Sequence, residues 1–221
     1  PHEHIFINLS AFFEERPLKD IPNPAEEKVK MEHLGQLNRD PYALKDNLAM
    51  DDYEVQKKEI LRFKAAGGTT MVDATMPGIG RDPETLARIS RETGLNVIMG
   101  TGYYVDSTHP NKLQSMSEEE IATLMCGEIN EGVNGIKAGV IGEIGISENC
   151  SEAEKKVLRA AAIAHQKTGV GVLVHINPWT TNGLEAADIL LEKLDRPVGG
   201  YSHRMVVPQL QKRGNEVKHI G

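Results

Sequence analysis

Hydrophobic positions along the chain form short continuous runs that alternate with longer amphipathic segments. The runs at 5–9, 69–74, 95–99, 139–144 and 170–176 are apolar or β-branched, which predicts five strands. The segments that follow the later runs place apolar residues at helical spacing, as in the leucine-rich segment 184–194. Continuous apolar strands that alternate with helices are typical of a parallel sheet covered by helices. The pattern therefore predicts an α/β fold.

Capping residues mark where the predicted helices begin and end. Two capping boxes, at Ser117 and Ser151, predict helices that end at Gly132 and Gly169. Asp51, with a glutamate three residues on, predicts the start of another helix. The remaining predicted helices cover 82–94 and 184–194.

Residues 14–50 interrupt this regular alternation. They are polar, contain four prolines and show no clean period. A loop of this length inside a compact domain is usually functional or covers a ligand. We therefore expect 14–50 to be a long functional loop.

Charge and cysteine content exclude several classes of protein. The chain has 221 residues with 25 Lys and Arg against 32 Asp and Glu, a net charge of −7, and lacks an Arg-rich run. This balance argues against nucleic acid as a partner, and no apolar run reaches the ~20 residues of a membrane span. Cys126 and Cys150 form no motif, which fits a reducing compartment. We expect a cytoplasmic protein with a small-molecule substrate, no nucleic-acid or membrane partner, and a homodimer as the candidate assembly.

Four residues of the types that bind metals fall at or inside predicted strands. His2 and His4 are two apart, so both imidazoles can point to one side of a strand. Glu143 lies inside an apolar strand, where a carboxylate is costly unless it is paired or bound to a cation, and His175 ends the most apolar strand. The alternatives are surface histidines at 2 and 4, a salt bridge from Glu143 to Lys137 or a histidine, and a core histidine held by a backbone carbonyl at 175. Together, histidine and carboxylate donors suit Zn, Mn, Fe or Co.

Several segments resemble one known family. They are PHEHIF at 1–6, GGTTMVDATMPGIGRDPETL at 67–86, GTGYYVDSTHP at 100–110, GIKAGVIGEIG at 135–145 and VLVHI at 172–176. With these segments the chain resembles the phosphotriesterase-related proteins, the branch of the amidohydrolase superfamily in which a glutamate bridges the metals. The resemblance extends over nearly all of 1–198.

The resemblance implies a TIM-type (β/α)8 barrel with a two-metal centre at the carboxyl ends of its strands. By this resemblance His2 and His4 would bind the more buried ion, Glu143 would bridge the two ions, and His175 would bind the second. Tyr104 would line the substrate pocket, with packing of its loop as the alternative. The implied cofactors are two divalent ions, Zn first, with Mn, Co or Fe as alternatives.

The barrel predicted from this resemblance is incomplete. Only 23 residues follow Val198, whereas three more strand–helix units need roughly 90. The family's metal-binding histidine of strand 6 is therefore unassigned, as is the catalytic aspartate of strand 8. His203 is one candidate for the strand-6 ligand, but 199–214 resembles more closely the family's segment beyond strand 8. We interpret 1–221 as a single barrel domain with about five units, lacking segments before residue 1 and around 198/199. No motif surrounds three other histidines, which we expect to be solvated: His33, His109 and His219.

These observations predict a metal-dependent hydrolase. The bond cleaved would be an ester, lactone, amide or phosphotriester bond, attacked by a metal-bridging hydroxide. The alternative is a non-catalytic protein that binds a small molecule on the same barrel.

Overall fold

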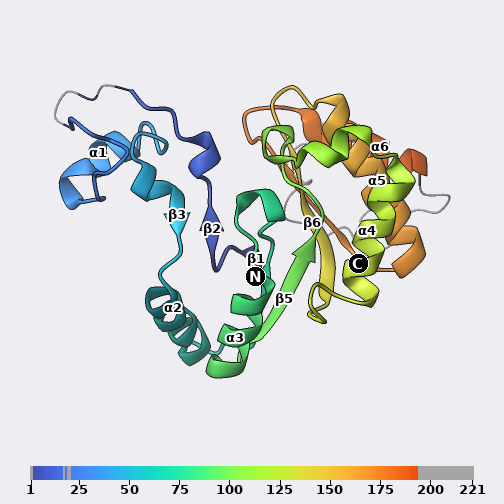
Figure 1. Ribbon diagram of the computed structural model, residues 1–221, viewed down its shortest axis with the longest axis horizontal. Coiled ribbons are helices and arrows are strands. Elements are labelled where there is room, and N and C mark those ends of the chain that lie inside the picture. Colours follow the sequence, from blue (N-terminus) through green and yellow to red (C-terminus); the bar gives the residue numbers. More distant parts are fainter. Residues whose placement is uncertain (1, 17, 19–20, 194–221) are drawn as a thin grey trace, which may run out of the picture. The chain divides into compact units, whose positions relative to one another are not determined.

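The computed structural model describes residues 2–16, 18 and 21–193 (Figure 1). Its strands are β1 (His2–Glu3), β2 (Ile7–Asn8), β3 (Ala49–Met50), β4 (Thr70–Asp73), β5 (Asn96–Thr101), β6 (Ala138–Ile146) and β7 (Val172–Ile176). Its α-helices are α1 (Leu34–Leu37), α2 (Tyr53–Ala65), α3 (Pro83–Thr93), α4 (Glu118–Asn130), α5 (Glu152–Thr168) and α6 (Asn182–Lys193). The described chain divides into two compact units, one ending at Val97 and the other starting at Ile98. The prediction of a single domain over 1–221 stays a prediction.

Five of these strands form one sheet in the order β1-β4-β5-β6-β7, and β2 and β3 form a separate two-stranded sheet. β1 pairs with β4 in parallel in the first unit, and β6 pairs in parallel with β5 and with β7 in the second. The order follows the chain, and a helix comes after each of β4, β5, β6 and β7. Parallel strands joined in sequence by helices are the repeating unit of a (β/α)8 barrel, so the α/β prediction is confirmed.

The first parallel strand is not where the hydrophobic pattern placed it. The structure puts β1 at His2–Glu3, ahead of the predicted strand at 5–9. The backbone N–H of Ile5 donates to the side-chain carboxylate of Asp73 at 2.8 Å rather than to a backbone carbonyl oxygen of β4, which ends the backbone pairing of the two strands. Residues Ile7 and Asn8 then form β2, which pairs antiparallel with β3.

Most predicted helix caps are confirmed. Ser117 and Ser151 each form both halves of a capping box, and Gly169 ends α5 in the left-handed conformation. The start of α2 differs by one residue, because the carboxylate of Asp52, rather than that of Asp51, accepts from the backbone N–H of Val55.

Residues 14–50 are more ordered than the polar pattern indicated. They contain α1 and short 3-10 turns, and they bury a cluster of their own made of Ile21, Leu37, Ala43 and Leu44. Whether this segment covers a ligand stays a prediction.

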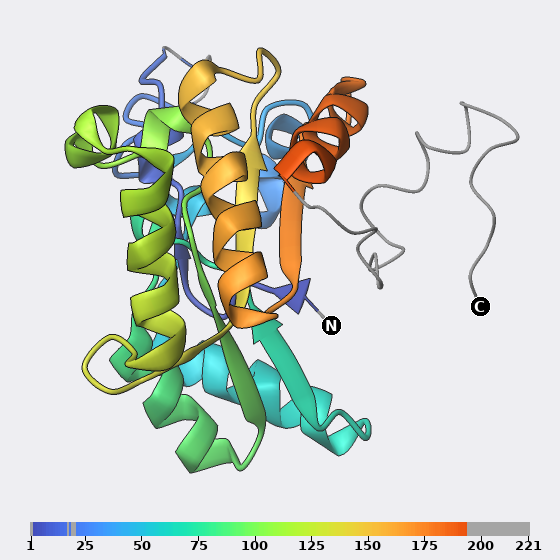
Figure 2. The same ribbon diagram turned by 90° about the vertical axis from the view of Figure 1, so that its right-hand side faces the viewer.

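The second unit has the larger hydrophobic core. Helices α4, α5 and α6 lie side by side, and α4 and α5 pack against β6 (Figure 2). Alanines on α5 allow this close packing, since four of them are completely buried: Ala160, Ala161, Ala162 and Ala164. This packing supports β6 and β7, the two strands that carry Glu143 and His175.

Candidate metal-binding residues

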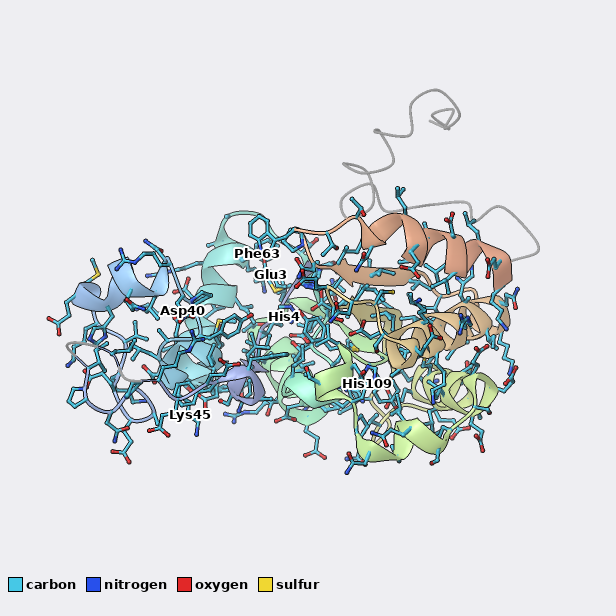
Figure 3. All side chains as sticks on the ribbon, turned by 90° about the horizontal axis from the view of Figure 1, so that it is seen from above. Glu3, His4, Asp40, Lys45, Phe63 and His109 are labelled. Carbon is cyan, nitrogen blue, oxygen red and sulfur yellow. The ribbon has the colours of Figure 1, made fainter. Side chains whose placement is uncertain are left out.

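His2 and His4 lie close together at the start of the first unit. β1 ends at Glu3, and His4 follows it directly (Figure 3). The two imidazole rings meet edge to face, with centroids 5.4 Å apart. The structure therefore brings together the pair that the spacing predicted, on the strand that pairs with β4.

Thr75 orients the His4 ring. The Thr75 hydroxyl donates its one proton to the carbonyl oxygen of Phe6 at 3.1 Å. The same hydroxyl oxygen lies 3.0 Å from Nδ1 of His4, and with its proton already used it can only accept a hydrogen bond from that nitrogen. The proton of a neutral His4 is therefore on Nδ1, and the lone pair is on Nε2. A histidine that donates from one nitrogen to a fixed partner presents the other to a metal ion.

Asp73 fixes the backbone on which His4 and Thr75 stand. Its buried carboxylate accepts from the N–H of Ile5 at 2.8 Å and from the N–H of Thr75 at 3.1 Å. Burial raises the pKa of Asp73, and the hydrogen bonds oppose that shift. Sequence reasoning missed both Asp73 and Thr75, although a carboxylate at the end of an apolar strand, with a threonine two residues on, could have drawn attention to them.

Glu143 is held in the middle of β6 by close backbone packing. The side chain is only 2% exposed. Gly142 before it has φ +117°, and a Cβ there would overlap the carbonyl oxygen of Leu173 on β7. Gly145 after it allows the loop beyond β5 to approach, because a Cβ there would overlap backbone atoms of Tyr104 and Val105. The glycines on both sides of Glu143 are therefore packing requirements.

His175 lies next to Glu143, on the neighbouring strand. The register aligns His175 with Gly145. Nδ1 of His175 is 3.4 Å from Oε2 of Glu143. The two predicted ligands of the second unit are therefore neighbours, and with a protonated imidazole the same contact would be the salt bridge that was the alternative for Glu143.

Tyr104 reaches His175 from the loop after β5. Its hydroxyl oxygen is 3.0 Å from Nε2 of His175, and the two ring centroids are 5.0 Å apart. Whether Tyr104 lines a substrate pocket stays a prediction.

Two side chains fix the loop that carries Tyr104. Nε2 of His109 donates to the carbonyl oxygen of Tyr104 at 2.6 Å. The buried carboxylate of Glu154 accepts from the backbone N–H of Asp106 at 3.0 Å, and also from Ser147 and Ser151. These contacts join the loop after β5, the end of β6 and the start of α5.

Two histidines that we expected to be solvated are buried instead. The His109 side chain is 5% exposed, and His33 is 7% exposed. His33 accepts from the N–H of Lys30 and closes the 3-10 turn in which it lies. Local hydrogen bonds of this kind leave no recognisable motif. His203, His219 and the junction at 198/199 lie outside the described residues.

Comparison with known proteins places the chain in a family. The model of the Phosphotriesterase family matches residues 1–197. The chain belongs to the phosphotriesterase family. This confirms the resemblance on which the predicted ligand set depends.

Several relatives and solved structures are similar to the chain. It is 41% identical over 183 residues to N-acetyltaurine hydrolase of Homo sapiens, and the aligned region covers 79% of this chain and 50% of that protein. It is 37% identical over 179 residues to the phosphotriesterase-related protein of Nematostella vectensis, covering 79% of this chain and 51% of that protein. The chain thus spans about half the length of the curated relatives it matches.

Solved structures of this phosphotriesterase family confirm the barrel. A resiniferatoxin-binding protein from Rhodobacter sphaeroides superposes with a TM-score of 0.83 at 37% identity, over 87% of this chain and 54% of that one. The phosphotriesterase homology protein of Escherichia coli, complexed with phosphate in its active site, superposes with a TM-score of 0.68 at 31% identity. That superposition covers 87% of this chain and 57% of the other one. The five strands are therefore part of a (β/α) barrel. Each helix in the described part of the chain is too short or too polar to span a bilayer.

Proposed function

We propose that this protein is a metal-dependent hydrolase of the phosphotriesterase family. The observation that carries the proposal is the contact between Glu143 and His175, a buried carboxylate beside an imidazole nitrogen on adjacent parallel strands. Parallel α/β barrels place their active sites at the carboxyl ends of such strands. The family match over residues 1–197 supports a hydrolase.

The donors present fit a divalent metal centre. His2, His4 and Glu143 carry ligand atoms of the types that hold a metal ion, and His175 adds a further imidazole nitrogen. Imidazole and carboxylate ligands suit Zn, Mn, Fe and Co. Thr75 places the lone pair of a neutral His4 on Nε2, and a cation would offset the cost of burying the Glu143 charge. We propose that these four residues are the metal ligands for two divalent ions, Zn first.

Each group of residues has a definite task in the proposed reaction. A bound divalent ion lowers the pKa of water to near 7 and polarises the oxygen of the scissile bond. His2 and His4 supply nitrogen donors whose direction is set by β1 and by Thr75. Glu143 supplies negative charge at a fixed point of β6, His175 lies beside it, and Tyr104 contacts His175.

The proposed substrate is a small acylated amine. N-acetyltaurine hydrolases are among the relatives, with identities up to 41%. Since N-acetyltaurine contains an amide bond, we propose amide hydrolysis as the first reaction to test. Esters, lactones and phosphotriesters are the alternative bonds.

Metal analysis and a substrate panel test this function. The purified full-length protein should contain about two divalent ions per chain, should lose activity on chelation, and should regain it with Zn, Mn or Co. Glu143→Gln should lower both metal content and hydrolysis. Glu148→Gln, an exposed change in the loop after the same strand, is the control. Freshly purified protein with less than half an ion per chain, or an unaffected Glu143→Gln variant, would contradict the proposal.

A second candidate function is binding without turnover. The relative from Rhodobacter sphaeroides is described as a resiniferatoxin-binding protein, and its structure superposes well on this chain. Saturable binding of a panel compound without any product, in protein loaded with metal, would favour this candidate. Cytoplasmic location and a homodimer stay predictions.

A further inference from the structure

The two ring nitrogens of His175 face two different side chains. Nδ1 lies 3.4 Å from Oε2 of Glu143, while Nε2 lies 3.0 Å from the hydroxyl oxygen of Tyr104. The side chain of His175 is 36% exposed, so burial alone does not fix the ring. The Tyr104 hydroxyl therefore gives Nε2 a partner different from that of Nδ1.

The proton count of the ring gives Tyr104 a chemical role as well. A neutral imidazole carries one proton, and the nitrogen that binds a metal must carry the lone pair. If Nδ1 presents its lone pair on the Glu143 side, the proton lies on Nε2 and needs an acceptor. The Tyr104 hydroxyl can accept it, because a phenol both donates and accepts hydrogen bonds.

We propose that Tyr104 is a positioning residue that accepts the Nε2 proton of His175 and so keeps the Nδ1 lone pair directed toward the cation held with Glu143. This positioning role rests on the proposed metal-dependent function and extends it to a residue that is not itself a metal ligand. It also differs from a substrate-wall role, in which Tyr104 would contact substrate and leave the metal affinity unchanged.

The backbone around Tyr104 is built to hold the hydroxyl in place. The carbonyl oxygen of Tyr104 accepts from His109, and the N–H of Gly145 donates to the carbonyl oxygen of Tyr103 at 3.3 Å. At Gly145 the absence of a side chain is what lets the Tyr104 ring lie against β6. The hydroxyl is thus held from the strand that carries Glu143.

The test is the affinity of the full-length protein for Zn in the absence of substrate. Tyr104→Phe keeps the ring and removes only the hydroxyl. We expect the variant to bind Zn about 10-fold to 100-fold more weakly, the range seen when a partner of a metal ligand is lost, with an unchanged circular dichroism spectrum. In the Co-loaded protein, the visible absorption spectrum should change as well. Tyr42→Phe, which removes the hydroxyl of a tyrosine in the 14–50 segment, is the matched control and should bind Zn like the wild type.

The outcomes separate this inference from the function on which it rests. If the wild type binds Zn and Tyr104→Phe binds it equally well, the positioning role is overturned; a raised KM alone would then favour the substrate wall. If the wild type binds none of Zn, Mn, Co and Fe, the proposed function fails and this role fails with it. If Tyr104→Phe binds Zn more weakly than the wild type while Tyr42→Phe binds it normally, the positioning role is supported.

Discussion

Glu154 offers the sharpest prediction of stability, because one fully buried carboxylate satisfies four donors. Oε1 accepts from the N–H of Asp106, and Oε2 accepts from the N–H and hydroxyl of Ser147 and from the N–H of Ser151, all at 3.0–3.1 Å. Glu154→Gln keeps the shape but replaces one oxygen with an amide group. Of the two orientations open to the new amide group, the one that places its oxygen at the Oε2 position keeps three of the four hydrogen bonds. Only the N–H of Asp106 then loses its acceptor.

The size of the loss follows from these contacts. One donor without an acceptor costs about 1–3 kcal/mol, and each of the three retained bonds loses about 1 kcal/mol with the charge. Because Ser147 and Ser151 are half-buried and water can partly replace the lost contacts, we expect the free energy of unfolding to fall by about 2–4 kcal/mol.

Urea unfolding followed by circular dichroism measures this change. The matched control is Glu152→Gln on the same helix, where the side chain is 81% exposed and pairs with Lys155 at 3.2 Å. The control should change the free energy of unfolding by less than about 0.5 kcal/mol. A Glu154→Gln variant as stable as this control would refute the reasoning.

Three further predictions concern other parts of the chain. Thr75→Val removes the acceptor for Nδ1 of His4, so Zn affinity measured by competition with a chelator should fall about 10-fold; an unchanged affinity would contradict the assigned tautomer. Gly145→Ala should lower the melting temperature and weaken Zn binding, because the added methyl group displaces the loop that carries Tyr104; a fully stable variant with normal Zn affinity would rule this out. Hydrogen bonds from Lys57 and Arg88 lower the pKa of Glu92 from 4.5 to about 2. The ionised Glu92 therefore stabilises the fold above pH 4.5, and this contribution is lost as the pH falls toward 2. The melting temperatures of wild type and Glu92→Gln should converge over that range, and a constant difference would argue against the shift.

Patterns with a strong local cause were predictable from the sequence. Continuous apolar runs located β4 to β7, and the capping boxes at Ser117 and Ser151 located α4 and α5. The closeness of His2 and His4 also followed from their spacing. The closeness of Glu143 and His175 followed from the family resemblance, or from the alternative of a salt bridge to a histidine, and not from a local pattern.

Features that depend on contacts between distant residues could not be predicted in this way. β1 lies at His2–Glu3 because Asp73, 68 residues away from Ile5, ends the strand pairing. The burial of His109 depends on the carbonyl oxygen of Tyr104, in a loop with no recognisable pattern. The role of Thr75 depends on where the Phe6 carbonyl oxygen points.

The glycines on either side of Glu143 limit how this protein can be redesigned. Gly142 and Gly145 have no room for a side chain, because neighbouring backbone occupies the space. Position 144 belongs to the opposite face of the strand, where Ile144 is part of the hydrophobic core. Within 142–145 of β6, the carboxylate therefore cannot be moved to a neighbouring position, and 143 is the position that can carry it. A library intended to change substrate preference should leave this segment intact and vary the loops that follow the strands, such as the one bearing the exposed Trp179.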